Sequence, residues 1–257
     1  MTALTNWFQG IDLSRIIEWL MFAAAAIIAI CVHESSHALS ALWLGDDTAK
    51  RMGRISLNPL RHLDVVGFLM MVVAHFGWAK PVPVNPYRMT KVKNPKVGMA
   101  LTAAAGPVSN ILLALLFCLL MQVCGIGFYE KYWTGELGRN SLQYYLFLFF
   151  AICFLLNAGL AVFNLIPISP LDGSKILAIF LPNKAHEWLM RWERYGFIIL
   201  AVLLFTGLLD GPLELLRGGL LRSVLALDLP LARLLTGTEL SSDVLSYLFK
   251  SSLGLIG

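Results

Sequence analysis

The chain has 257 residues, of which 58% are hydrophobic and only 14% are charged, and its mean hydropathy is +0.71. About one quarter of the residues in a soluble domain are charged, so this composition excludes an ordinary soluble protein and favours one that lies in lipid. The formal net charge of +4 does not indicate a nucleic-acid-binding protein, because the basic residues are concentrated in the connections between apolar segments.

Four apolar segments are candidates for membrane-spanning helices, which need about 20 mainly apolar residues. They cover residues 16–44, 99–123, 142–166 and 196–209, the last extending toward Leu216. The first segment continues through its alanine run and follows no basic region, so we interpret it as a retained helix and not as a cleavable signal. The mixed sequence after Leu216 is compatible with an interfacial helix or with a partial crossing. The sequence thus predicts four or five crossings.

The connection between the first two crossings has a different character. Leu63–Trp78 is apolar but short, which favours a re-entrant hairpin or a half-span. Ile55–Leu60 and Ala79–Pro86 carry prolines at spacings that exclude a regular helix, and Val82-Pro83-Val84 alternates as an edge strand does. The predicted fold is therefore an all-α polytopic membrane protein with small membrane-associated β-strands, in a single domain over residues 1–257.

The distribution of charge predicts how the chain is oriented. Nine lysines and arginines lie within residues 45–97, whereas the 125–141 connection holds two basic and two acidic residues. By the positive-inside rule, residues 45–97 and 168–194 lie in the cytoplasm, and the N-terminus and the 125–141 connection face outward. We expect a multi-pass protein of a bacterial cytoplasmic membrane. Its four cysteines lie in apolar segments without a CxxC pair, so we expect buried free thiols.

The segment His33-Glu34-Ser35-Ser36-His37 brings metal-binding side chains into the first apolar helix. Residues four apart project from the same face of a helix, so the two imidazoles converge on one point. Glu34 lies close enough to reach a water molecule bound to a metal there. This is the HExxH arrangement of two zinc ligands and a general base. Zinc lowers the pKa of its bound water toward about 7, and the glutamate takes the proton as the water attacks a carbonyl.

The depth of these groups in the helix favours a metal site over a chance match of five residues. Each ionisable group in hydrocarbon costs on the order of 2.5–3.5 kcal/mol on insertion scales. A bound metal would offset that cost, and so would a hydrogen-bonded cluster between helices. Catalytic zinc takes three protein ligands. The best third candidate is Asp172, which follows the 142–166 helix at the end where the charge rule also places the HExxH motif.

Three motifs in this order, on separate helices, resemble the site-2 proteases, the intramembrane metalloproteases. They are the HExxH of residues 33–37, Gly106-Pro107-Val108-Ser109-Asn110, and the distant Leu171-Asp172-Gly173. The resemblance covers about residues 16–180, which would be the catalytic core, followed by a C-terminal helix and tail over about 195–257. It implies that His33, His37 and Asp172 bind one zinc ion per chain and that Glu34 is the catalytic base.

The resemblance also implies an endopeptidase that acts in the lipid bilayer on membrane-anchored proteins, such as single-span substrates. In it Asn110 would line the active site, and Asn164 with Pro167 would help to hold the substrate strand. The sequence departs from the family at Ser169, where many members have a second proline. An unwound substrate helix cannot leave its backbone unsatisfied in lipid. A strand edge in residues 54–60 or 79–84 could pair with it.

Two other functions remain open from the sequence. A zinc-binding transporter or channel also carries intramembrane histidines and carboxylates, but it does not require a base beside two ligands, and no second HExxH-like segment marks a repeated half. A scaffold that binds helices without catalysis is the other alternative. Among the remaining polar residues, we expect His62 to be interfacial, and Asn157 to face either a partner helix or a substrate. Gly106-Pro107 would permit close helix packing and a bend.

Overall fold

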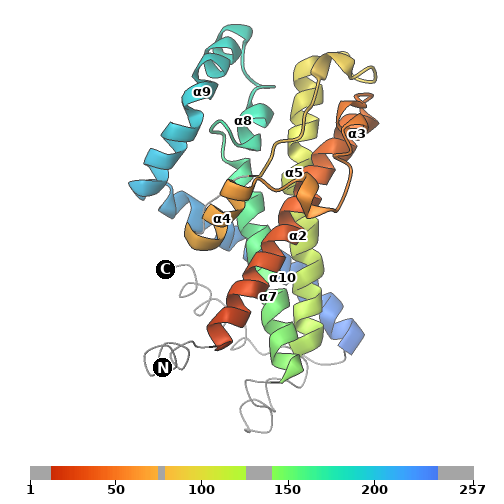
Figure 1. Cartoon of the computed structure of the whole chain (residues 1–257), viewed down its shortest axis with the longest axis vertical. Coiled ribbons are helices and arrows are strands. Elements are labelled where there is room, and N and C mark those ends of the chain that lie inside the picture. The colour runs from red at the N-terminus through yellow and green to blue at the C-terminus, as the bar shows by residue number, and fades with distance from the viewer. Residues whose placement is uncertain (1–12, 75–78, 126–140, 237–257) are drawn as a thin grey trace, which may run out of the picture.

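The computed structural model describes residues 13–74, 79–125 and 141–236, and this part of the chain is mostly helical (Figure 1). Within it, three helices are long and apolar enough to cross a membrane: α2 (Leu13–Trp43), α5 (Pro95–Gly125) and α7 (Leu142–Leu165). The pair α9 (Asn183–Phe205) and α10 (Asp210–Thr236) adds a fourth if it counts as one span, bent by 88°. A polytopic helical membrane protein is confirmed, whereas the predicted count of four to five crossings is not.

The spanning helices begin and end where the local sequence supplies caps. Pro95 opens α5, because proline fits the first helical position, and the Asn94 side chain accepts a hydrogen bond from the Lys96 N–H at 3.0 Å. Ser141 caps α7 by accepting from the Tyr144 N–H at 3.2 Å. The helix ends one residue before Ile166, which precedes a proline and is extended.

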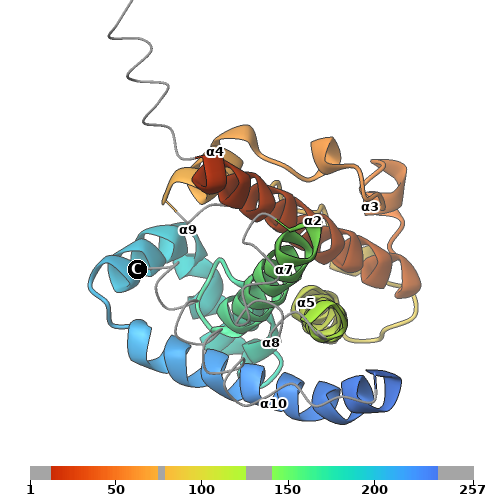
Figure 2. The same cartoon turned by 90° about the horizontal axis from the view of Figure 1, so that it is seen from below.

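The core of the bundle lies where α2, α5 and α7 cross, with α10 running across them on one side (Figure 2). Small side chains dominate these crossings, and Ala25, Ala114, Ala151 and Ala158 are all buried. In lipid, helices associate through close packing and not through exclusion of water, so small residues at the contacts are expected. Leu221 and Val224 of α10 belong to the same core. The region after Leu216 is therefore part of the helical assembly.

Short elements make up the connections between the long helices. They are α3 (Thr48–Arg51), η1 (Pro59–Arg61), α4 (Val65–Ala74), η2 (Pro86–Arg88) and α8 (Asp172–Leu177). The prediction that Ile55–Leu60 excludes a helix is wrong at its end, because Pro59 opens the 3₁₀ turn η1. There the Asn58 side chain accepts from the Leu60 N–H at 3.0 Å. Proline is disfavoured in helix interiors but fits first positions well.

The predicted β-strands are not confirmed. Within the described residues the pairing is limited to one isolated antiparallel bridge between Leu63 and Ala79, beside a hydrogen bond from the Lys80 N–H to the His62 carbonyl at 2.8 Å. These contacts bring together the two ends of the predicted re-entrant segment. The chain enters α4 and returns at the same place, beside α2 (Figure 1). Residues 75–78 of that segment lie outside the described part.

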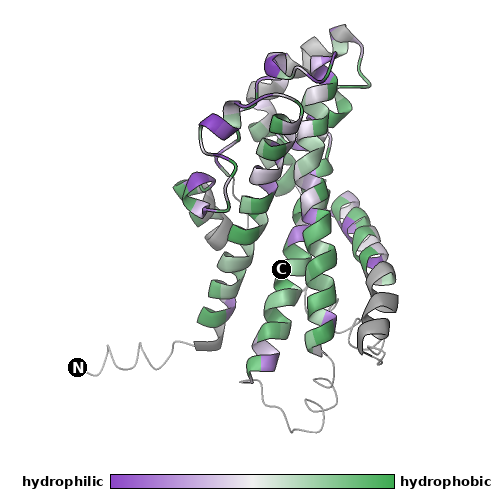
Figure 3. Ribbon diagram, turned by 90° about the vertical axis from the view of Figure 1, so that its right-hand side faces the viewer, coloured by the Kyte–Doolittle hydropathy of each residue, from purple (hydrophilic) through white to green (hydrophobic). Residues whose placement is uncertain are grey.

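The direction of the three long helices agrees with the charge pattern. The helices α2, α5 and α7 alternate in direction, so the connections after α2 and after α7 lie at the same end of the bundle (Figure 1). Hydrophilic residues gather at that end, and the opposite half is apolar (Figure 3). All four cysteines are free, as predicted, and three of them are buried, whereas Cys124 is only partly buried.

Candidate metal centre

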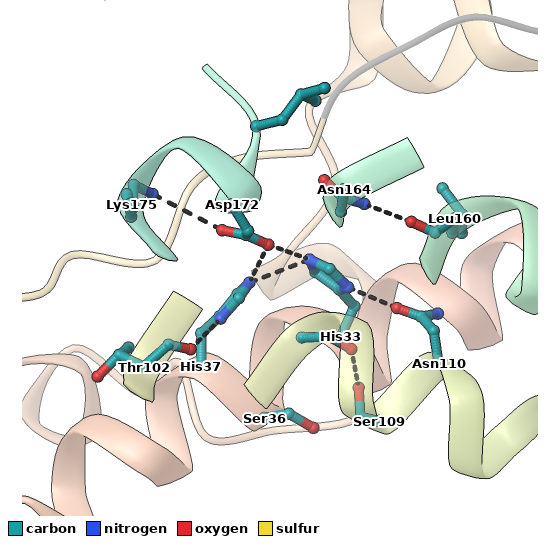
Figure 4. Close-up of polar contacts among 12 residues, drawn as sticks. His33, Ser36, His37, Thr102, Ser109, Asn110, Leu160, Asn164, Asp172 and Lys175 are labelled. Carbon is teal, nitrogen blue, oxygen red and sulfur yellow. Dashed lines mark hydrogen bonds and ion pairs between the residues drawn. The ribbon is translucent and has the colours of Figure 1, made fainter. Parts of the chain in front are cut away.

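Three predicted ligands from two distant segments meet inside the bundle (Figure 4). His33 and His37 lie one turn apart on α2, and Asp172 is the first residue of α8. The Asp172 Oδ2 atom lies 3.2 Å from the His33 Nε2 atom and 3.1 Å from the His37 Nε2 atom, and the two nitrogens are 3.0 Å apart. All three residues are buried, and they form a group that could hold a metal ion.

The donor set and its dimensions fit zinc. Zinc binds imidazole nitrogens and carboxylate oxygens at about 2.0–2.2 Å with tetrahedral geometry, which places neighbouring ligand atoms about 3.3 Å apart. The three observed separations of 3.0–3.2 Å are close to that value. His37 Nδ1 lies 2.7 Å from the Thr102 carbonyl, which can only accept, so the proton of a neutral His37 is on Nδ1. Its Nε2 lone pair then points at a nitrogen and a carboxylate oxygen, an arrangement that either a bound cation or an added proton stabilises.

One face of α5 shapes the other side of the site. Thr102, Gly106 and Asn110 are spaced by four residues and therefore share a face. The Thr102 carbonyl accepts from His37, and the Asn110 Oδ1 atom lies 2.5 Å from the Nδ1 atom of His33. Both histidines thus have a hydrogen-bond partner on Nδ1, as metal-binding histidines usually do. Asn110 was predicted to line the active site, and the structure places it behind His33.

Gly106 makes the contact between α5 and the two imidazoles possible. A Cβ atom added at Gly106 would lie 2.5 Å from the Cε1 atoms of His33 and His37 and 2.5 Å from the His37 Nε2 atom. Real Cβ atoms essentially never approach other atoms so closely. The Gly-Pro pair was predicted to permit helix packing, and the structure shows that the close partner is the metal centre.

Asp172 is positioned by the packing of its neighbour Gly173 and by a contact between its carboxylate and Lys175. A Cβ atom on Gly173 would lie 2.3 Å from the Leu165 carbonyl oxygen and 2.4 Å from that of Ile166, so α8 sits directly against the end of α7. The second oxygen of the carboxylate is 3.7 Å from the Nζ atom of the half-exposed Lys175. Burial acts to raise the pKa of Asp172, but the hydrogen bonds and charge of the two imidazoles outweigh it and hold this pKa well below its usual range.

The other predicted residues lie around this centre without contributing to the triangle of donors. Glu34 follows His33 on α2 and is half-buried. The Asn164 amide donates to the Leu160 carbonyl of its own helix at 3.0 Å, and Pro167 is exposed just after α7. Among the described residues, no hydrogen bond joins Asn164 or Glu34 to the three donor groups.

Two residues have a larger part in the site than the sequence indicated. Asn157 is completely buried on α7, and its Oδ1 atom accepts from the Asn110 amide at 2.8 Å. His62 was predicted only to be interfacial, and the structure shows that its side chain has partners within the protein. It is completely buried, and its Nε2 atom donates to the Ser56 carbonyl at 2.6 Å, the same oxygen that accepts from the hydroxyl of Ser35. This contact ties the loop before α4 to the HExxH turn.

Comparison with known proteins agrees with this geometry. The sequence profile described as "Peptidase family M50" matches residues 21–207, which include every residue of the centre. The protein named "Putative zinc metalloprotease YwhC" of Bacillus subtilis is 40% identical over 185 residues, 71% of this chain and 78% of that protein. Rip2 of Mycolicibacterium smegmatis, which carries the same designation, is 28% identical over 77% of this chain and 71% of its own length.

A relative that matches over a shorter stretch and the solved structures complete the comparison. MJ0611 of Methanocaldococcus jannaschii, also designated a zinc metalloprotease, is 32% identical over 115 residues, which cover 44% of this chain and 49% of that protein. No solved structure matches the chain. With the match to family M50 over most of its length and a buried His-His-Asp centre in a helical bundle, the chain belongs to the site-2 protease family of zinc metalloproteases.

Proposed function

We propose that the protein is an intramembrane endopeptidase that cuts membrane-anchored proteins, with His33, His37 and Asp172 as zinc ligands and Glu34 as the general base. The observation that carries this proposal is the convergence of the three donors, one residue from a free carboxylate, within an apolar helical bundle. A zinc ion bound there would supply Lewis-acid activation of a water molecule and of the scissile carbonyl.

Glu34 is the residue that moves the proton. Its carboxylate has no hydrogen-bond partner among the described residues, and it is only half-buried, which supports a role in binding a water molecule beside His33. In the proposed reaction it takes a proton from the attacking water and returns it to the nitrogen of the leaving amine, as a general base and then a general acid. A zinc transporter would have no use for a carboxylate in this position.

The segment before η2 is our candidate for binding the substrate backbone. Ala79 packs against Ala26 and Ile30 of α2, and the Asn85 N–H donates to the Asp46 carboxylate beyond the end of α2 at 2.6 Å. The residues between them therefore run past the level of the HExxH motif. The distance from Ile30 to the end of α2 is about 20 Å, which six residues cover only when nearly fully extended.

Several features leave this segment available for pairing. The structure gives no backbone hydrogen bond to the N–H groups of Val82 and Val84 within the described residues. The guanidinium of the buried Arg54 donates to the carbonyls of Lys80 at 2.5 Å and Pro81 at 2.8 Å and fixes the start of the segment. We propose that an unwound substrate adds to this edge as a β-strand, because its freed backbone groups need partners in lipid.

Asn164 and Pro167 are proposed to hold the substrate on the opposite side of the centre. Asn164 uses its amide nitrogen within α7, so its carbonyl oxygen remains free to accept from a substrate N–H. The exposed ring of Pro167 would stiffen the chain beside it.

We also propose that the centre lies toward the cytoplasm of a bacterial membrane. The connection after α2, which is rich in basic residues, lies at the same end of the bundle as the connection after α7, which contains Asp172 (Figure 1), and the positive-inside rule places that end in the cytoplasm. A cysteine introduced at the exposed Lys93 should react with a membrane-impermeant reagent in inverted vesicles and not in intact cells. Labelling of intact cells would reverse the proposed orientation.

The decisive experiment compares the wild type with Glu34→Gln in liposomes, measuring zinc content and cleavage of a single-span substrate. Glu18→Gln is the matched control, because it makes the same chemical change on α2 far from the centre. We expect one zinc ion per chain in all three proteins. Cleavage should fall by 10²–10⁴-fold, the usual contribution of a general base, in Glu34→Gln alone. Zinc-dependent cleavage that survives in Glu34→Gln would refute the role of this residue.

A further inference from the structure

A chain of buried amides leads from α7 through α5 to the metal centre. Asn157 and Asn110 are both completely buried. The Asn157 Nδ2 atom donates to the carbonyl of Cys153 at 2.8 Å, the Asn110 Nδ2 atom donates to Asn157 Oδ1 at 2.8 Å, and Asn110 Oδ1 lies 2.5 Å from His33 Nδ1. Three consecutive hydrogen bonds thus join a backbone carbonyl to a zinc ligand.

The first bond of this chain has only one possible direction. The Cys153 carbonyl is a backbone acceptor with two lone pairs and no proton to give. The side-chain atom of Asn157 beside it must therefore be the NH₂ group, because an amide oxygen in that position would face another oxygen. The orientation of the Asn157 amide is fixed by the helix that carries it.

This direction passes to the next two residues. Because the Asn157 nitrogen donates to the Cys153 carbonyl, its side-chain oxygen faces Asn110 and accepts a hydrogen bond. The Asn110 amide must therefore donate an N–H to it. Asn110 then presents its own oxygen to His33, so the Nδ1 atom of that histidine must carry the proton. In a neutral imidazole the other nitrogen is then an acceptor. The Nε2 lone pair of His33 consequently points toward Asp172 and His37, where the metal would bind.

We propose that Asn157 is a positioning residue that holds His33 in the tautomer able to bind zinc. This inference rests on the proposed role of His33 as a ligand. Without Asn157, the amide of Asn110 can turn over and offer its N–H to His33, which stabilises the tautomer with the proton on Nε2. Zinc binding would then have to reverse both the amide and the tautomer. The loss of such an outer partner lowers metal affinity by about 10–100-fold.

The variant that tests this proposal is Asn157→Leu, which keeps the size of the side chain and removes the amide. Gln122→Leu is its matched control. Gln122 is also a completely buried amide, lies three turns after Asn110 on α5, and among the described residues its side chain donates to the Cys118 sulfur of its own helix, at 3.3 Å. Zinc affinity would be measured by competition with a chelator. The proton on His33 would be located by ¹⁵N NMR in the zinc-free protein at alkaline pH.

We expect Asn157→Leu to bind zinc 10–100-fold more weakly than the wild type and to place part of the His33 proton on Nε2. Gln122→Leu should match the wild type in both measurements. A zinc affinity of Asn157→Leu within twofold of the wild type, with the proton still on Nδ1, would overturn the inference. If His33→Ala kept the wild-type zinc affinity, the proposed ligand set would be the part that failed.

A second variant separates positioning from a general loss of packing. Adding Asn110→Asp to Asn157→Leu places a group that only accepts behind His33, so the Nδ1 proton is required whatever residue 157 is. We expect this double variant to regain zinc affinity and the Nδ1 proton. If zinc affinity stays low in the double variant while thermal unfolding matches that of the wild type, the tautomer is not what Asn157 controls.

Discussion

Replacing Gly106 with alanine is the smallest change that tests the geometry of the metal centre. The added Cβ atom would lie 2.5 Å from atoms of both His33 and His37, whereas ordinary contacts begin at 3.4 Å. The imidazoles or α5 must therefore move by about 0.9 Å. Zinc ligands tolerate about 0.2 Å, so the displacement is several times larger than the site can accept. We expect Gly106→Ala to lose at least 100-fold in zinc affinity and all measurable cleavage.

The fold itself should survive this substitution. Alanine is favoured over glycine in a helix by about 1 kcal/mol, so Gly106→Ala should leave α5 intact. Gly159→Ala on α7 is the matched control, because its Cβ atom would meet no atom within 4 Å, and it should bind zinc as the wild type does. Zinc content, helical circular dichroism and cleavage would be measured together. Full zinc occupancy in Gly106→Ala would refute the close approach of α5 to the two imidazoles.

Three further predictions concern the surroundings of the site. Gly173→Ala should weaken zinc binding more than tenfold, because its Cβ would meet backbone oxygens at 2.3 and 2.4 Å and push Asp172 away. Unchanged zinc affinity in a chelator competition would contradict this prediction. Arg54→Lys should lower cleavage severalfold at unchanged zinc content, because lysine lacks the planar guanidinium that donates to the Lys80 and Pro81 carbonyls. Cleavage equal to that of the wild type would argue against substrate pairing at residues 79–84. Removing zinc should lower the Tm of the wild type, because a ligand at 100 times its Kd stabilises a protein by about 2.7 kcal/mol. It should not lower the Tm of Asp172→Ala, which lacks one proposed ligand, and equal shifts in both proteins would contradict the proposed ligand set.

Two kinds of feature in the site could be predicted: residues at a helical spacing along the chain, and ionisable residues whose burial in lipid costs free energy. Two histidines four residues apart in an apolar helix define a direction by helix geometry alone, and a carboxylate at the same depth needs a compensating partner. The structure brings His33, His37 and Asp172 to within 3.2 Å of one another. The positions of apolar helices were also predictable, because the thickness of the bilayer sets their length.

The parts that escaped prediction depend on which faces of different helices meet. The spacing of Thr102, Gly106 and Asn110 by four was visible in the sequence, but the partner of that face was not. For the same reason Asn157 could not be assigned to a partner helix or a substrate. The burial of His62 was not predicted, because the sequence around it is that of a connection, whereas the structure packs the two ends of the α4 hairpin against α2. The predicted β-strands are reduced to one isolated bridge among the described residues. The prolines of these segments have no N–H to donate to a ladder.

The separation of the three donor groups along the chain has a consequence for biogenesis. His33 and His37 enter the membrane with the first helix, whereas Asp172 is synthesised only after α7 has followed. A nascent chain that has inserted α2 and α5 therefore presents two histidines without their carboxylate, and it has no complete site in which to retain zinc. With the proposed ligand set, cleavage therefore has to wait until Asp172 has been synthesised and most of the chain has left the ribosome.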